Sequence, residues 1–301
     1  MSSVREVFIP DDDDHVIVSV DYASQELRIL ANACKDETLL SAYQANPPLD
    51  LHALTGTGLV PLFAPRFGID IADCVLDNPK RANYAWFLEH FNDDTKQGKF
   101  LKTCRAYGKT ANFGVANTIG PGKTSTQLMI PLADGELILQ AMAETYPGIQ
   151  KWKDAVYKQA ANDGYVRTPF GSYRHCGRRL TVGSRAEISR MQRQLSNFLM
   201  QGTAADLLKV ALTMMTRRGT LKTHRARLIG PIYDELLFHV PKATLHAFLL
   251  DICDDMEQEI PGQIVPMVAD CSFGPSWGKQ HEVGNRPSLD KVNETLEKIA
   301  A

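Results

Sequence analysis

Two pairs of acidic residues, far apart in the sequence, have types and positions suited to metal-dependent chemistry. Asp21 ends the apolar run 17–20, Glu26 follows about one helical turn later, and Asp234 and Glu235 form a second pair far downstream. An apolar run that changes at once to helical spacing predicts a buried strand with Asp21 at its C-terminal tip. Mg²⁺ takes one or two carboxylates from protein and completes its shell with substrate phosphates. Two carboxylates on strand tips therefore predict a two-metal site for phosphoryl transfer.

A second stripe of residues could bind the phosphates that such a reaction consumes. Arg105, Lys109 and Phe113 are spaced i, i+4 and i+8, so on a helix they share one face. Two cations one turn apart suit a triphosphate, and an aromatic ring one turn further suits a sugar or base. The stripe alone is more typical of a surface Arg–Lys pair above a core phenylalanine, because i,i+4 pairs are common.

The apolar spacing predicts the elements that must position these side chains. A strand over 16–20 leads into a helix over 24–34, and a hairpin over 227–240 carries Asp234 at its tip. Further elements are predicted as helical stretches over 80–118, 134–162, 184–217 (interrupted near Gly202) and 241–258, strands over 164–171 and 264–271, and a short helix from about Ser288. Residues 46–75, rich in Pro and Gly, are predicted to be loops.

Composition bounds the class of protein. The 301 residues are 44% hydrophobic with a net charge of −2, which is enough for one large domain or two interleaved ones. Basic residues gather in two groups: Arg167, Arg174, His175, Arg178, Arg179, Arg185, Arg190 and Arg193, then Arg217, Arg218, Lys222, His224, Arg225 and Arg227. One such run is typical of a solvated face, whereas two runs flanking a metal site favour an anionic polymer as partner.

The six cysteines are far apart and form no C-x-x-C pair, and no long apolar segment or signal peptide is present. We therefore expect reduced thiols in a cytoplasmic protein, of a bacterium or of a phage-infected cell. The eight histidines lack metal-ligand spacing, which argues against a zinc site.

Several motifs, in order, resemble family A DNA polymerases of the bacterial polymerase I type. The segment 21–28 (DYASQELR) resembles motif A, and 105–114 (RAYGKTANFG) resembles motif B. The segment 201–206 (QGTAAD) is similar to a helix of that family, and 233–236 (YDEL) is similar to motif C. The resemblance covers about residues 4–278, and the ordered set is far more specific than any one motif.

This resemblance implies an α/β (α+β) fold, with a right-hand polymerase palm containing an antiparallel sheet and with mostly helical fingers. The implied boundaries are palm over 1–40 and 186–281, fingers over 41–185, and a C-terminal tail over 282–301. The thumb and exonuclease domains are expected to be absent.

The resemblance also implies roles for individual residues. Asp21 and Asp234 would bind two Mg²⁺ ions together with the backbone carbonyl of Tyr22, and Glu235 would support this catalytic site. Glu26 would exclude a ribose 2′-hydroxyl.

On the nucleotide side, the resemblance assigns Arg105 and the catalytic Lys109 to the triphosphate and Phe113 to the sugar. The residues expected to contact DNA are Arg193, Asn197, Gln201 and Asn117. The first three are spaced i, i+4 and i+8, so on one helix face they can reach the minor-groove acceptors that every base pair offers.

The sequence also departs from the family pattern. Only 20 residues precede Asp21, so we expect either a fragment or a naturally split, phage-like enzyme whose second chain supplies the thumb and possibly an exonuclease. Asn117 and Tyr233 replace the usual tyrosine and histidine, and Gly230-Pro231 predicts an irregular strand. The long span between the first two motifs predicts an insertion near residues 57–100.

The leading function is template-directed DNA synthesis with a primer–template, dNTPs and Mg²⁺. A single-subunit RNA polymerase is an alternative, although the carboxylate of Glu26 argues against it. A DNA-binding or scaffolding subunit with an impaired site is a second alternative. The apolar face Leu289, Val292, Leu296 and Ile299 of the tail would dock either a partner or the palm itself.

Overall fold

The computed structural model describes residues 4–116 and 119–300. These residues form two compact units that interleave along the chain. The first unit comprises Met1–Arg28, Pro169–Ser172 and Gly202–Ala301, and the second comprises Ile29–Thr168 and Tyr173–Gln201. Two helices, α1 (Gln25–Cys34) and α9 (Arg185–Arg218), run from one unit into the other. Within the described ranges, no helix is both long and apolar enough to cross a bilayer.

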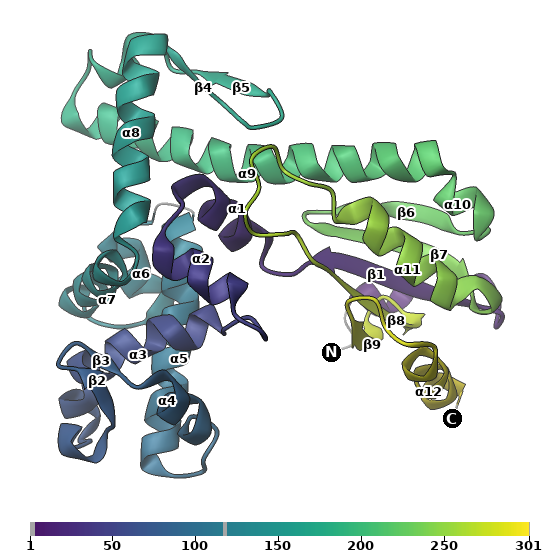
Figure 1. Ribbon diagram of the computed structural model, residues 1–301, viewed down its shortest axis with the longest axis horizontal. Helices are drawn as coiled ribbons and strands as arrows, with labels where there is room; N and C mark the ends of the chain where they lie inside the picture. The colour runs from purple at the N-terminus through teal and green to yellow at the C-terminus, as the bar shows by residue number, and fades with distance from the viewer. Residues whose placement is uncertain (1–3, 117–118, 301) are drawn as a thin grey trace. The chain divides into compact units, whose positions relative to one another are not determined.

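The first unit is built on a five-stranded antiparallel sheet in the order β6-β7-β1-β8-β9 (Figure 1). Its strands are β1 (His15–Tyr22), β6 (Arg227–Ile232), β7 (Glu235–Pro241), β8 (Ala269–Ser276) and β9 (Lys279–Gly284). Its other elements are η1 (Val4–Val7), α10 (Thr220–Thr223), η5 (Lys242–Thr244), α11 (Leu245–Met256) and α12 (Leu289–Ala300). The predicted combination of an antiparallel sheet with helices is confirmed.

The central position of β1 in the sheet explains why residues 16–20 form an apolar run. This strand lies between β7 and β8, and residues 16–20 are all buried. A strand covered on both faces needs apolar residues at successive positions rather than alternating ones. Helix α11 packs on β7 and β8, where the rings of Phe238 and Phe248 meet edge to face with centroids 5.1 Å apart.

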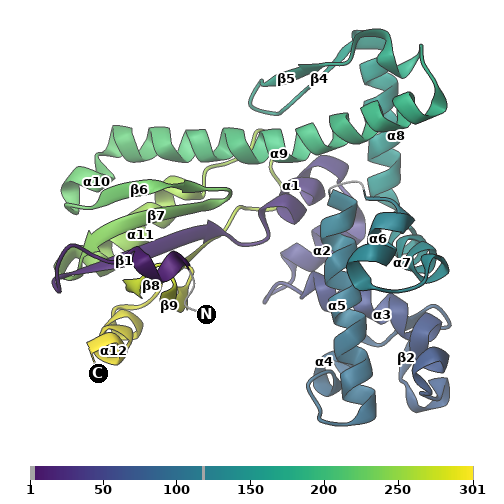
Figure 2. The ribbon, with the colours of Figure 1, turned by 180° about the vertical axis from the view of Figure 1, so that it is seen from behind.

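The second unit is mostly helical (Figure 2). Its helices are α2 (Glu37–Gln44), α3 (Leu51–Phe63), α4 (Tyr84–His90), α5 (Lys96–Ala116), α6 (Pro121–Leu128), α7 (Leu132–Thr145) and α8 (Pro147–Asp163). Short 3₁₀ turns occur at η2 (Ala64–Phe67), η3 (Ile71–Asp73) and η4 (Gly177–Leu180), and two small hairpins pair β2 (Leu76–Asn78) with β3 (Arg81–Ala82) and β4 (Tyr165–Arg167) with β5 (Tyr173–His175).

The loop predicted over 46–75 is wrong, because this segment contains the buried helix α3. Asp50 caps the helix by accepting hydrogen bonds from the backbone N–H groups of His52 (2.8 Å) and Ala53 (3.1 Å). Glycine is accommodated in α3 because α3 and α5 approach each other too closely for a larger residue (Figures 1 and 2). A Cβ atom on Gly108 of α5 would lie 2.5 Å from the carbonyl oxygen of His52, and one on Gly56 would lie 3.2 Å from the Cα atom of Arg105.

Three other boundaries differ from the prediction. Helix α9 continues through Gly202 without interruption, because a single interior glycine costs only about 1 kcal/mol. The stretch 134–162 divides at Tyr146, since Pro147 begins a new helix more readily than it extends one. The strand expected over 264–271 begins only at Ala269, after Pro266, which has no backbone N–H to donate.

Other predictions are confirmed. The helix after Asp21, the 227–240 hairpin and the short helix near Ser288 are all present. The irregularity expected at Gly230-Pro231 is a register shift between Leu228 and Gly230 on the edge strand β6. The tail helix α12 contacts β9 and buries Val292, while Leu289 remains exposed.

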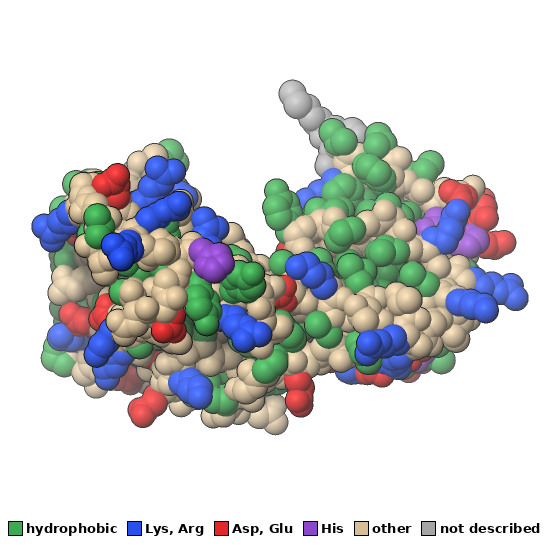
Figure 3. Space-filling model, turned by 90° about the horizontal axis from the view of Figure 1, so that it is seen from above, with side chains coloured by type: hydrophobic (Ala, Val, Ile, Leu, Met, Phe, Trp, Pro, Cys, Tyr) green, Lys and Arg blue, Asp and Glu red, His purple; other side chains and the backbone are tan. Residues whose placement is uncertain are grey.

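The surface beside the β4–β5 hairpin is rich in cations. Figure 3 looks onto the face that carries these strands, where Lys and Arg side chains lie among hydrophobic ones. This distribution agrees with the first basic group of the sequence.

The close approach of α3 and α5 leads to a stability prediction. Gly108→Ala should destabilise the protein by about 1–3 kcal/mol, because the new methyl group must displace backbone atoms of α3. Gly122→Ala in α6 is the matched control, since its added methyl group meets no atom within 4 Å. Urea unfolding should show Gly122→Ala to be neutral or more stable by up to about 1 kcal/mol. Equal stability of the two variants would contradict the backbone contact.

Candidate active site

An acidic cluster forms where three strands of the sheet meet. Asp21, next to last in β1, is in register with Glu235 at the start of β7 and with Asp270 near the start of β8. Asp234 occupies the turn between β6 and β7, directly before Glu235. The antiparallel register therefore brings together carboxylates that are more than 200 residues apart in sequence.

Burial and like charge both disfavour the ionised form of Asp21 in this cluster. Burial, followed by repulsion from Asp234 and Asp270, raises the pKa of Asp21 to about 6. Glu235 adds to the same repulsion. A cation bound among these oxygens would remove this penalty on the ionised form.

Asp270 is a cluster residue to which the sequence analysis assigned no role. Burial and the nearby Glu282 raise the pKa of its carboxyl, and Arg28 opposes the rise. The available signal was an aspartate within the apolar segment 267–271, which resembles the pattern at the end of β1.

Glu235 is held by its neighbours. Its Oε1 atom accepts hydrogen bonds from Ser19 Oγ and, at 2.9 Å, from Trp277 Nε1. These donors come from β1 and from the segment after β8, so they fix the carboxylate within the sheet.

The turn from β1 into α1 is also secured. Arg28, nearly buried, donates from Nε to the carbonyl of Ala23 (2.8 Å) and from Nη1 to that of Pro266 (2.7 Å). Tyr22 buries its side chain and donates its hydroxyl to the carbonyl of Met256 at 2.8 Å. The Tyr22 side chain is therefore part of the hydrophobic core, and only its backbone carbonyl is suited to bind a metal ion. Glu26 is half-buried in the first turn of α1.

In the second unit, helix α5 carries the predicted phosphate-binding stripe. Arg105 donates from Nε to Asp50 Oδ2 at 2.7 Å, and its guanidinium lies 5.8 Å from the ring centroid of Phe91. Burial alone would raise the pKa of Asp50, but the hydrogen bond from Arg105 and the helix-cap hydrogen bonds lower it. Lys109 is exposed and forms no ion pair within the described residues. Phe113 is 40% exposed.

His52 adjoins this stripe, although the sequence analysis gave it no role. Its ring centroid is 5.6 Å from that of Phe113, and its Nδ1 atom lies 3.0 Å from Nδ2 of the buried Asn112. Asn112 Oδ1 also accepts a hydrogen bond from Thr55 Oγ1 at 2.8 Å. Burial lowers the pKa of His52, and Lys109 acts in the same direction, which favours the neutral imidazole.

The predicted DNA-contacting residues lie on α9. Arg193 is exposed, and Asn197 has a buried Oδ1 atom for which the described residues provide no hydrogen-bond donor. Both line a hollow of about 390 Å³ together with Ile119, Gly120, Lys123, Arg190 and Gln194. Gln201 is exposed one turn further along. Asn117 lies outside the described residues.

The donor set fits Mg²⁺ better than zinc. Asp21 and Asp234 offer hard carboxylate oxygens, and a bound cation would relieve the repulsion between their charges. Among residues 4–116 and 119–300, no three His, Cys, Asp or Glu side chains are grouped so that they could hold a metal ion. An open set of protein oxygens that substrate phosphates complete is the usual arrangement for Mg²⁺.

Comparison with known proteins identifies the family. A sequence model of DNA polymerase family A matches residues 1–62 and 91–279. This chain therefore belongs to DNA polymerase family A.

Similar proteins include DNA polymerase I of Streptococcus pneumoniae serotype 4 (28% identical, 91% of this chain, 27% of that protein) and DNA polymerase I of Bacillus subtilis strain 168 (26% identical, 91% and 27%). The chain thus spans about a quarter of the length of these relatives. The fold is similar to the POL domain of Pol1 from M. smegmatis in complex with DNA primer-template and dNTP, with a TM-score of 0.70, 21% identity and coverage of 91% of this chain and 42% of that one.

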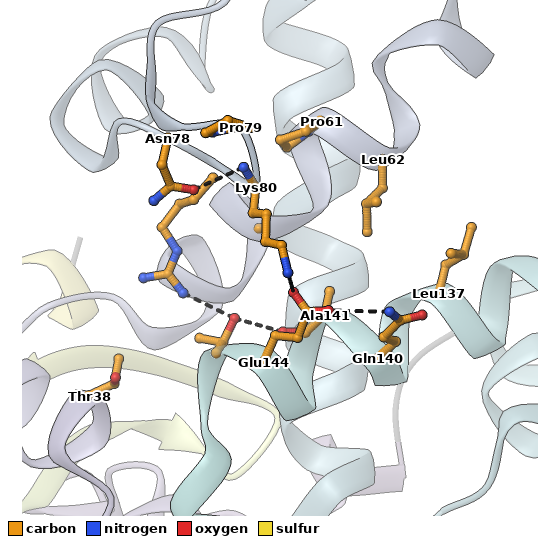
Figure 4. A pocket seen from close by; sticks show the side chains of 13 residues that line it. Thr38, Pro61, Leu62, Asn78, Pro79, Lys80, Leu137, Gln140, Ala141 and Glu144 are labelled. Carbon is orange, nitrogen blue, oxygen red and sulfur yellow. Dashed lines mark hydrogen bonds and ion pairs between the residues drawn. The ribbon is translucent and has the colours of Figure 1, made fainter.

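The family model leaves residues 63–90 unmatched, within the region where an insertion was predicted (57–100). Residues 78–81 of this segment line one side of an open hollow of about 700 Å³ beside α3 and α7 (Figure 4). Lys80 Nζ pairs with Glu144 Oε2 at 2.9 Å, and Arg81 donates to Thr145 Oγ1 at 3.0 Å. The β2–β3 hairpin is thereby attached to α7.

The acidic cluster predicts coupled titration. Asp234→Asn should lower the pKa of Asp21 from about 6 toward the 3.8 of an isolated aspartate, because one like charge is removed. Carboxyl-carbon NMR titration of the metal-free protein measures this shift. Glu294→Gln on the exposed face of α12 removes one charge elsewhere and should leave the titration unchanged. An unaltered midpoint in Asp234→Asn would contradict the coupling.

Proposed function

We propose that this chain catalyses template-directed DNA synthesis, joining a deoxynucleoside triphosphate to the 3′-hydroxyl of a primer. The observation that carries the proposal is the strand register that aligns Asp21 with Glu235 and Asp270, beside Asp234 in the adjoining turn. Membership of DNA polymerase family A supports the reaction class. The primer oxygen forms a bond to the α-phosphorus, the bond to pyrophosphate breaks, and the hydroxyl proton passes to solvent.

Asp21 and Asp234, with the backbone carbonyl of Tyr22, would hold two Mg²⁺ ions. When bound, these ions supply a positive charge that stabilises the attacking and leaving oxygens. Glu235, fixed by Ser19 and Trp277, positions the β7 end of the cluster. Asp270 adds negative charge that favours cation binding.

The α5 stripe would bind the incoming nucleotide. Lys109, exposed and without an ion pair among the described residues, is suited to a phosphate. Arg105 is oriented through its Nε atom by Asp50, which leaves its terminal nitrogens for a second phosphate contact. Phe113 would pack on the sugar, and Glu26 would crowd a ribose 2′-hydroxyl.

The α9 face would follow the newly formed duplex. Arg193, Asn197 and Gln201 lie on successive turns of one helix. Such side chains can test the shape of a base pair through minor-groove acceptors without reading its sequence. The structural relative from M. smegmatis was solved with DNA primer-template and dNTP, which supports these partners.

We assign the palm to residues 1–40 and 186–281, the fingers to 41–185, and a tail to 282–301. We also propose that a second protein chain supplies a thumb. Primer extension by this chain alone, compared with extension in the presence of co-purified chains, tests this partnership through the length of the products. Long products from the isolated chain would contradict the need for a partner.

The central test is primer extension by cluster variants. Asp21→Asn and Asp234→Asn should each reduce nucleotide incorporation at least about a hundredfold, because each removes a charge that the transition state requires. Asp13→Asn, in the exposed turn before β1, is the matched control and should retain full activity. Near-normal extension by either cluster variant would refute the assignment.

A second test separates nucleotide binding from DNA binding. Lys109→Ala should raise the KM for dNTP about tenfold and leave the affinity for primer–template unchanged, because its charge acts on the triphosphate. Lys102→Ala, an exposed lysine on the same helix, should change neither quantity. A matching loss of duplex affinity in Lys109→Ala would instead assign this lysine to the duplex.

A further inference from the structure

The two-stranded ribbon β4–β5 presents one face composed of aromatic and basic residues. Tyr165 pairs with His175, and Arg167 pairs with Tyr173. Side chains two apart on a strand, and side chains directly opposite on paired strands, point to the same face. These four residues, here called the ribbon face, therefore lie together.

The rings of the ribbon face contact one another and remain open to solvent. The ring centroids of Tyr173 and His175 are 5.0 Å apart, and those of Tyr165 and Tyr173 are 6.3 Å apart, both edge to face. Tyr173 is 62% exposed and Tyr165 is 40% exposed. Soluble proteins rarely leave a group of aromatic rings exposed without a partner.

The opposite face anchors the ribbon. Val166 is buried, and Arg174 donates from Nη2 to Gln194 Oε1 on α9 at 3.4 Å. Strand β4 also contacts α8, and the carbonyl of Gly164 accepts a hydrogen bond from the backbone of Cys176 at 2.7 Å. The ribbon face is thus held outward on a supported element.

Basic residues predominate in the sequence around the ribbon, although Asp163 directly precedes it and Asp206 accepts a hydrogen bond from Ser172 Oγ at 2.8 Å. Residues 164–193 contain seven arginines, no aspartate and one glutamate, Glu187. That glutamate accepts hydrogen bonds from the backbone and hydroxyl of Ser184, so it is engaged in capping α9. Arg178 and Arg179, on the turn that follows β5, are exposed.

We propose that the ribbon face binds single-stranded DNA by stacking unpaired bases on Tyr165 and Tyr173, with the neighbouring arginines on the phosphates. Aromatic rings within a cationic surface are the usual means of holding a single strand without sequence preference. A duplex suits the arginines but not the rings, because its bases are already stacked on one another. This inference rests on the proposed function, since a polymerase that copies a template handles unpaired bases.

The test measures binding rather than synthesis, so its outcome is independent of catalytic activity. The full chain, without dNTP or Mg²⁺, is titrated into a fluorescein-labelled oligothymidylate, an abasic strand of the same length, and a blunt duplex. The variants are Tyr165→Ala/Tyr173→Ala and the ring-preserving control Tyr165→Phe/Tyr173→Phe. Circular dichroism establishes that both variants fold.

The alanine pair should weaken oligothymidylate binding at least about tenfold, the scale expected for loss of stacking on two bases. The phenylalanine pair should bind as the unaltered chain does. Affinities for the abasic strand and the duplex should be the same in all three proteins, because phosphate contacts with arginine remain. Asp21→Asn should bind the oligothymidylate normally, which separates this inference from the proposed catalysis.

Three results would overturn the inference. Undiminished oligothymidylate binding by the alanine pair would show that the rings do not stack on bases. Equal losses for oligothymidylate and the abasic strand would show that the ribbon contacts phosphates only. A larger loss for the duplex would assign the ribbon face to paired DNA.

Discussion

The backbone register of β1 with β7 and β8, which brings carboxylates together at the ends of three strands, is the constraint on which the candidate site depends. Asp21 is placed against Glu235 and Asp270 by the backbone register of β1 with β7 and β8. The side chains cannot separate without disrupting the sheet, so their charge is held in place. A folded-state pKa of about 6 for Asp21, above its ordinary 3.8, means that the metal-free protein loses stability as pH rises between these values. The fold therefore maintains a site that a divalent cation would stabilise.

The second unit positions its cations differently, by close helix packing. Gly56 and Gly108 allow the backbones of α3 and α5 to touch, and the contact brings the capping residue Asp50 to Arg105. One carboxylate thus both begins α3 and orients a guanidinium of α5. Buried hydrogen bonds from Asn112 to Leu51 and His52 join the same helices one turn further along. The phosphate-binding stripe accordingly depends on small residues that carry no charge.

Local patterns in the sequence predicted the strands that carry the acidic residues of the candidate site. The apolar run before Asp21 predicted a buried strand, and both faces of β1 are indeed covered. The two apolar runs on either side of Asp234 predicted a hairpin, and β6 and β7 form it. Helix α3 was missed because its glycines and Pro61 are typical of loops, whereas Gly56 permits close contact with α5. No role was predicted for Asp270, because its place beside Asp21 comes from the register of β8 with β1, a long-range relation that local spacing does not encode. The position of His52 beside Phe113 and Asn112 likewise depends on the approach of α5.

The most direct test of the charged cluster is thermal melting of the chain as a function of Mg²⁺, at constant ionic strength. Mg²⁺ at a hundred times its dissociation constant should stabilise the unaltered chain by about 2.7 kcal/mol, because it binds only the folded cluster. The double variant Asp21→Asn/Asp234→Asn should melt higher than the unaltered chain without metal and should not respond to Mg²⁺. An equal response to Mg²⁺ in both proteins, or a lower melting temperature of the metal-free variant, would contradict the account.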